Sequence, residues 1–186
     1  MRYLVKFLII ISAISCDTKT MQEKIDNQCD LDQIRSIKNG NISFYEVSES
    51  KSELVNKPVE QVSELIISCK NDSIFPKEIG QLINLKSLAV GGGNFDEFPF
   101  EIGNLKSLEQ LILINTSLKR LPAELYKIPK LKQVTIMYNL GEFEFGEELC
   151  QSENNLEITH TSTKLKQLPD CVKNSNRIKL INKEAH

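Results

Sequence analysis

The sequence has no tryptophan, and aromatic residues make up only 6% of its 186 positions, so its core must be mainly aliphatic. It has two histidines, His160 and His186, and no Cys-x-x-Cys or His-x-x-x-His pair of the kind that binds zinc. A formal net charge of -2 provides no broad basic field to attract nucleic acid. We therefore expect no metal, no cofactor and no nucleic-acid partner.

Patterns typical of catalysis are also missing. No serine or cysteine is accompanied by an identifiable base and an acid that would orient it. The run Gly91-Gly92-Gly93 lacks the Lys-Ser/Thr that completes a phosphate-binding loop, and it follows a predicted strand, so we interpret it as a tight turn. We expect a protein that is not an enzyme. The alternative is a catalytic site in the irregular C-terminal part, near His160.

The N-terminus carries a short hydrophobic run. Arg2 and Lys6 precede the apolar residues 7–14, which are too few to span a hydrocarbon core of about 30 Å. The run ends in Ala13-Ile14-Ser15-Cys16, where small residues fit the groove of a signal peptidase. A positive segment, a short apolar segment and small residues together indicate a cleaved export signal.

This segment resembles the signal peptide of bacterial lipoproteins, although Ala13 stands where leucine is usual. The resemblance implies that residues 1–15 are removed and that Cys16 becomes the lipid-modified N-terminus. Removal takes away Arg2 and Lys6 and no acid, which leaves 21 basic against 25 acidic residues, so the lipid alone would hold the protein to a membrane. The implied location is the bacterial cell envelope, at the outer membrane or cell surface rather than the inner membrane. An ordinary secretory signal and an uncleaved anchor are the alternatives.

A 23-residue repeat follows, in four units over 59–81, 82–104, 105–127 and 128–150. Prolines recur at this spacing, and three sets of aliphatic residues share it. They are Pro76, Pro99 and Pro122; Val62, Leu85, Leu108 and Leu131; Leu65, Leu88, Leu111 and Val134; and Ile67, Val90, Leu113 and Ile136.

Each unit contains two different kinds of segment. Leu111-Ile112-Leu113 alternates around a buried pair, which predicts a short strand. The proline half cannot continue a sheet ladder, because proline has no N–H, so it predicts an irregular or briefly helical return that Gly80 and Gly103 loosen at its end. Stacking such units gives a curved solenoid with a parallel sheet along one face.

This pattern closely resembles the leucine-rich-repeat family in its 23-residue Leu-Pro-x-x-Ile-Gly variety. The resemblance implies an α/β solenoid, a short horseshoe with a parallel sheet on its concave face, where a protein or peptide ligand binds. The family commonly has asparagine five residues after the central strand leucine, whereas this chain has Lys70, Gly93, Thr116 and Asn139. Only Asn139 keeps the asparagine ladder, in which these side chains bond backbone groups of neighbouring coils, so we expect looser turns. Phe145 stands where the fourth unit would have its proline.

The apolar interior of the first and last coils must be shielded from solvent by capping segments. We expect a tether over 16–35, an N-terminal cap over 36–58, and a degenerate fifth repeat with a C-terminal cap over 151–186. Within the first cap, 41–47 alternates like a strand and 48–54 predicts a short helix with a serine cap. The last region should hold strands at Leu156-Glu157-Ile158 and Ile178-Lys179-Leu180-Ile181.

Four cysteines remain once Cys16 is set aside. A disulfide between Cys150 and Cys171 would crosslink the C-terminal cap. Closing a loop of about 20 residues would raise the free energy of unfolding by roughly 3 kcal/mol. Cys29 and Cys69 would join the tether to the first coil. Spacing alone does not decide pairing, and the alternative is four free, buried thiols.

The concave side of the predicted sheet offers the candidate ligand-binding residues. An exposed apolar column there indicates a contact surface, although β-branched residues also favour strands wherever they point. The alternatives are that the caps or a second copy cover the face, in a structural or self-associating spacer. The candidates are Ile66, Ala89, Gln110, Ile112, Ile114, Gln133, Thr135 and Met137.

Overall fold

A computed structural model describes residues 34–35, 37, 40–48, 51–69 and 73–183. The expected signal peptide, Cys16 and most of the tether lie outside these residues, as does Cys29. Within the described part, no helix is long and apolar enough to cross a membrane.

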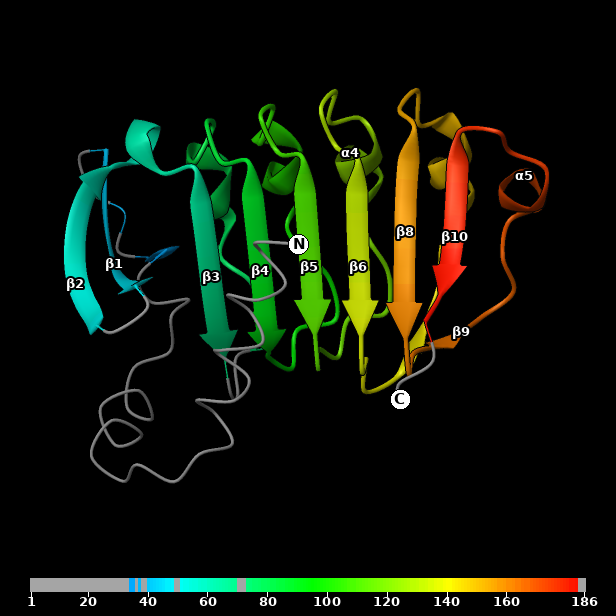
Figure 1. The fold of residues 1–186 in the computed structure, drawn as a ribbon, viewed down its shortest axis with the longest axis horizontal. Coiled ribbons are helices and arrows are strands. Elements are labelled where there is room, and N and C mark those ends of the chain that lie inside the picture. Colours follow the sequence, from blue (N-terminus) through cyan, green and yellow to red (C-terminus); the bar gives the residue numbers. More distant parts are fainter. Residues whose placement is uncertain (1–33, 36, 38–39, 49–50, 70–72, 184–186) are drawn as a thin grey trace.

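Six parallel strands form one sheet, and the chain adds them in sequence from one end to the other (Figure 1). Neighbouring strands pair with the offset of one repeat, so that Leu65 lies opposite Leu88 and Leu88 opposite Leu111. The repeat phase therefore predicted the register. The strands are β3 (Glu64–Cys69), β4 (Ser87–Gly92), β5 (Gln110–Ile114), β6 (Gln133–Met137), β8 (Leu156–Thr161) and β10 (Ile178–Asn182).

Short helices return the chain between strands and lie behind the sheet in Figure 1. Most begin directly after a proline, whose fixed φ and missing N–H suit the start of a helix. They are η2 (Lys77–Gln81), η3 (Phe100–Asn104), α4 (Ala123–Tyr126), η4 (Glu147–Gln151) and α5 (Asp170–Lys173).

Glycine in these returns has a packing role rather than the loosening role that we expected. A Cβ at Gly80 would lie 2.7 Å from the carbonyl oxygen of Glu101, and a Cβ at Gly103 would lie 2.7 Å from the Cβ of Glu124. Both glycines lie inside 3-10 helices. They allow the returns of consecutive coils to approach closely.

The core fills the space between sheet and returns with aliphatic side chains. Leu88, Leu111 and Val134, from three successive strands, are all completely buried. The ring of Phe75 packs edge-on against Phe98, with ring centroids 4.6 Å apart, and adds an aromatic contact between the first two coils. Burying each large aliphatic side chain contributes about 1.5–3 kcal/mol.

The N-terminal cap is a β-hairpin, which corrects part of our prediction. β1 (Asn41–Ser48) matches the expected strand, but 48–54 does not form a helix, because Lys51–Pro58 is a second strand, β2. The two strands pair antiparallel along their whole length, from Asn41 opposite Pro58 to Ser48 opposite Lys51. A ladder of this length outweighs the weak local helix preference of the serine-capped segment. A 3-10 turn, η1 (Val59–Gln61), then leads into β3.

The C-terminal region continues the solenoid by one more coil. β7 (Glu142–Phe143) pairs with β9 (Lys164–Leu165) on the return side, while β8 and β10 extend the main sheet. A disulfide joins Cys150 in η4 to Cys171 in α5, with Cα atoms 5.7 Å apart. The returns of two consecutive coils are therefore linked covalently.

A left-handed residue lies at the end of β4, β5, β6 and β8, at intervals of 23, 23 and 24 residues. φ is 72° at Gly92, 54° at Asn115, 54° at Tyr138 and 47° at Ser162. Glycine and asparagine adopt this conformation readily, whereas a tyrosine does so at a cost of about 1–2 kcal/mol. In the run Gly91-Gly92-Gly93, where we expected a tight turn, Gly91 and Gly92 end β4, and the positive φ of Gly92 and of Gly93 (90°) starts the turn that follows.

Candidate ligand-binding face

The register aligns side chains into rows across the concave face, meaning the face of the six-stranded sheet opposite the core. Neighbouring strands are about 4.8 Å apart, so a row across six strands extends about 24 Å. One row, the apolar row, consists of Ile66, Ala89, Ile112, Thr135, Thr159 and Ile181.

Exposure within and beside the apolar row differs from our expectation. Ile66 is 41% exposed, as predicted for a contact residue, but Ala89 and Ile112 are only 3% and 6% exposed. Ile114, in the next row, is 8% exposed. These three buried residues form a hydrophobic cluster separate from the core, and Met137 packs against it. The expectation of an exposed column is wrong at these three positions, because their side chains pack against one another and against Met137.

A polar row runs beside the apolar row, two residues nearer the start of each strand. The hydroxyl of Ser87 lies 3.4 Å from Gln110 Oε1, and Gln110 Nε2 donates to Gln133 Oε1 at 3.3 Å. Glu157 and Lys179 continue the row, with their charged groups 3.7 Å apart. Each glutamine amide offers two donors and an acceptor, so the row retains capacity for further hydrogen bonds.

Two exposed side chains with apolar surface follow the end of β6, and Leu140 also lines the groove described below. Tyr138 is 46% exposed and Leu140 is 62% exposed, both just beyond Met137 at the end of β6. Sequence analysis did not single them out. The signal was available, because Tyr138 falls where the repeat has Gly92 and Asn115, and strained backbone at a bulky residue often marks a functional site.

His160 points into the core side of β8. It lies opposite Ile136 in the row of core residues and is 9% exposed. Burial lowers its pKa, because desolvation disfavours the charged imidazolium. Its buried Nδ1 has no hydrogen-bond partner among the described residues, so no carboxylate orients the ring through this atom. This placement gives no support to an enzyme site at His160.

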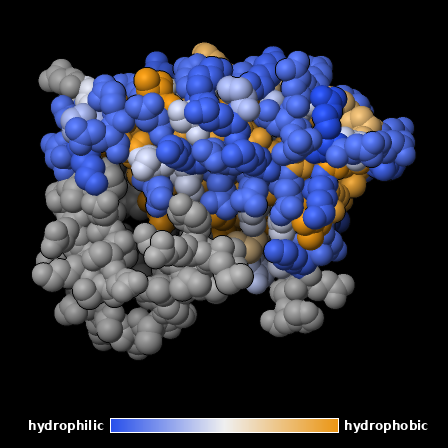
Figure 2. Space-filling view, turned by 45° about the horizontal axis from the view of Figure 1, so that its top comes forward, coloured by the Kyte–Doolittle hydropathy of each residue, from blue (hydrophilic) through white to orange (hydrophobic). Residues whose placement is uncertain are grey.

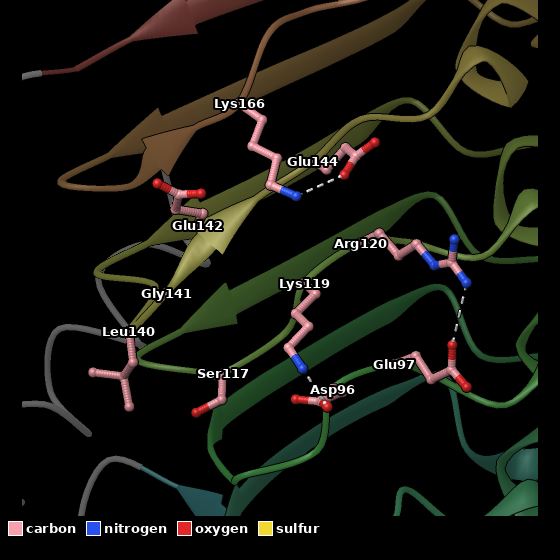
Figure 3. A pocket seen from close by; sticks show the side chains of 10 residues that line it. All are labelled: Asp96, Glu97, Ser117, Lys119, Arg120, Leu140, Gly141, Glu142, Glu144 and Lys166. Carbon is pink, nitrogen blue, oxygen red and sulfur yellow. Dashed lines mark hydrogen bonds and ion pairs between the residues drawn. The ribbon is translucent and has the colours of Figure 1, made fainter.

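A groove of about 720 Å³ lies on the return side, and its charges are paired within the chain. Figure 3 shows ion pairs that link consecutive coils: Lys119 with Asp96 at 2.6 Å, Arg120 with Glu97 at 3.8 Å, and Lys166 with Glu144 at 3.1 Å. Lys164 also pairs with Glu142 and, by its hydrogen bond and its charge, lowers the pKa of that carboxyl. Such compensation leaves little free charge to bind a ligand.

One group of side chains in the described residues has the spacing of a metal site, namely Glu147, Cys150 and Cys171. Both sulfurs belong to the disulfide, so neither is available as a thiolate ligand. The group is explained by the crosslink.

The comparisons with known proteins identify the fold. No protein-family model and no curated protein matches the chain. A leucine-rich-repeat protein of Leptospira interrogans has a similar structure, with a TM-score of 0.52 and 24% identity over 67% of this chain. The match spans 33% of the Leptospira chain.

Two plant receptor structures show more distant similarity. The leucine-rich-repeat ectodomain of the receptor kinase SOBIR1 from Arabidopsis thaliana has a TM-score of 0.45 and 17% identity, covering 79% of this chain and 81% of that one. The plant peptide hormone receptor RGFR1, solved with RGF2, has a TM-score of 0.46 and 22% identity, covering 66% of this chain and 24% of the receptor.

The six-stranded parallel sheet, the short helical returns and the Leptospira match define a leucine-rich-repeat solenoid of the α/β class. This confirms the fold that the 23-residue repeat predicted.

Proposed function

We propose that the protein is a non-enzymatic lipoprotein of the bacterial cell envelope that binds a protein or peptide ligand on its concave face. The arrangement of the polar row beside the apolar row is the observation that carries this proposal. Peptide-binding surfaces combine backbone hydrogen bonding with apolar contacts. This face has amides at Gln110 and Gln133 and apolar surface at Ile66 and Met137.

In this proposal the buried cluster supports the face rather than touching the ligand. Ala89, Ile112 and Ile114 fill the centre of the concave face and hold the neighbouring side chains in place. The contacts then come from the partly or fully exposed Ile66, Gln133 and Thr135 and from Tyr138 at the end of β6. Rigid support of this kind lowers the entropy lost on binding.

Lipid attachment at Cys16 rests on the lipoprotein-like signal and on the disulfide. Disulfides persist in exported proteins and are rare where thiols are kept reduced, so Cys150–Cys171 supports an exported protein. Residues 16–35 would then lift the solenoid from the membrane, with the outer membrane or cell surface favoured over the inner membrane.

Photo-crosslinking from single sites tests the face. A photoreactive amino acid replaces Gln133, on the concave face, or Lys106, which is exposed just after η3 and serves as the matched control. We expect a discrete crosslinked protein only from position 133, and its loss when Ile66→Lys is added. Equal crosslinking from positions 133 and 106 would show that the binding-face proposal is wrong. A crosslink from 133 to a second copy of the chain would favour the self-associating spacer.

Detergent phase partition tests the anchor. We expect the wild-type protein in the detergent phase and Cys16→Ala in the aqueous phase. If both remain aqueous, Cys16 carries no lipid and the lipoprotein proposal is wrong.

A further inference from the structure

The main sheet ends at β10, whose outer edge pairs with no strand in the described part of the chain. The carbonyl of Arg177 and the amide of Lys183 bond to β8, at 2.8 and 2.9 Å. Backbone groups of alternate residues in a strand point to opposite edges. Ile178, Leu180 and Asn182 therefore turn their amide and carbonyl groups outward.

Part of this edge is satisfied locally and part is open. The amide of Ile178 donates to the hydroxyl of Ser175 at 3.0 Å. Within the described residues, no backbone hydrogen bond reaches the outward groups of Leu180 or Asn182. The open edge is a template for one more strand.

The apolar interior is also less covered at this end of the solenoid. In the first coil Leu65 and Ile67 are 4% and 1% exposed, and the β1–β2 hairpin precedes that coil. In the last coil Leu165, Leu168 and Leu180 remain only partly buried. Figure 2 shows hydrophobic patches among hydrophilic residues toward this end and also toward the other end of the molecule. Solenoids need their terminal coils covered. Among the described residues α5 contacts β10 at this end, and these leucines stay partly exposed.

Basic residues surround the edge. Lys179 belongs to the polar row of the concave face, Arg177 and Lys183 flank β10 at its two ends, and all three are exposed. Lys179 lies 3.7 Å from Glu157, whereas Arg177 and Lys183 have no ion-pair partner within the part of the chain described. An added strand would therefore place acidic side chains on the concave side and apolar side chains against Leu180.

We propose that β10 accepts, as an additional strand, an extended segment of a partner protein in which acidic and apolar residues alternate. This surface is separate from the concave binding face and does not depend on it. A second copy of the chain fits less well. Antiparallel pairing of two β10 strands centred on Leu180 sets Arg177 opposite Lys183 at both ends, and like charges directly opposite each other destabilise a strand pair.

A fluorescent synthetic peptide of about seven alternating glutamate and valine residues is a suitable probe, with fluorescence anisotropy as the readout. The decisive variants are Asn182→Pro and Asn182→Ala. Proline removes the outward amide that an added strand needs, whereas alanine keeps it. The bonds from β10 to β8 come from the other residues and are preserved in both variants.

We expect the wild type and Asn182→Ala to bind alike and Asn182→Pro to bind at least about tenfold more weakly. The double variant Arg177→Glu with Lys183→Glu should also lose about tenfold, and added salt should weaken wild-type binding. The proposal is overturned if Asn182→Pro binds like Asn182→Ala, or if a lysine–valine peptide binds equally well. It is also overturned if the wild type is a dimer that Asn182→Pro converts to a monomer. Thermal unfolding of both Asn182 variants verifies that each is folded.

Discussion

Thr116 donates a hydrogen bond from its hydroxyl to Asn139 Oδ1 at 2.9 Å, across two consecutive coils and fully inside the protein. Asn139 Nδ2 in turn donates to the carbonyl oxygens of Leu118 at 3.0 Å and Gly141 at 3.2 Å. The threonine thus occupies the place of an asparagine in the ladder and supplies one of its bonds. The turns between these two coils are tied together rather than loose, which corrects our expectation at Thr116.

Replacing Asn139 should be costly. Asn139→Ala removes three hydrogen bonds and leaves buried polar groups without partners, so we expect the free energy of unfolding to fall by about 2–3 kcal/mol. Urea denaturation measures this loss. Asn94→Ala, at an exposed position, is the control and should change stability by less than about 0.5 kcal/mol. A loss at Asn139 no larger than at Asn94 would refute the role of the ladder.

Substitutions on the two faces of the sheet should lower the free energy of unfolding by different amounts, according to how deeply each side chain is buried. Leu111→Ala should cost about 2–5 kcal/mol by opening a cavity in the core. Ile112→Lys, on the opposite face, should also destabilise clearly, because its side chain is 6% exposed and a charge there loses solvation. Ile66→Lys, at 41% exposure, should be nearly neutral in the same urea titration. If Ile112→Lys is as mild as Ile66→Lys, the buried cluster is not real.

Tyr138 combines backbone strain with exposure. Tyr138→Gly should stabilise the fold by about 0.5–1 kcal/mol, because relief of the left-handed strain exceeds the greater flexibility of the unfolded chain. Thermal unfolding provides the measurement. Under the proposed function the same change should weaken ligand capture from position 133. Asn115→Gly, where the native residue already tolerates positive φ, should leave stability nearly unchanged.

The disulfide should contribute measurably. Changing both Cys150 and Cys171 to serine should lower stability by about 3 kcal/mol, because the crosslink restricts the unfolded chain. Urea titrations with and without a reducing agent measure the effect. The wild type should lose stability on reduction and the double variant should not. Equal sensitivity of both proteins to the reductant would contradict this account.

His160 should make stability depend on pH in the mildly acidic range. Its pKa is lowered in the folded state by burial, so the unfolded chain binds a proton more readily. Stability should therefore decrease as pH falls through about 6.5, the ordinary histidine value. The exposed carboxyls Glu142 and Asp170, whose pKa values are also lowered, lose their contribution only at lower pH. His160→Leu should remove the decrease between about pH 7 and pH 5.

The repeat made the main sheet predictable, because a fixed period and a proline at a fixed offset specify both the strands and their register. The prediction of a helix over 48–54 was wrong, because most of this segment pairs with the preceding strand. Local helix propensity contains no information about such pairing. The burial of Ile112 could not be predicted from the sequence either. It depends on contacts with Ala89 and Met137 from other strands, and only the three-dimensional packing shows whether these neighbours cover the Ile112 side chain. The open edge of β10 also became visible only once the sheet order was known.

The β1–β2 hairpin also limits how this architecture can change in size. Its strands pair antiparallel with each other rather than repeating the coil, so the array cannot be lengthened through it. New coils can be inserted between the hairpin and the disulfide-linked end. Duplication of one 23-residue unit would widen the concave face by about 4.8 Å and leave both ends intact. Longer solenoids with wider concave faces are thus accessible by internal gene duplication, without any redesign of the two ends.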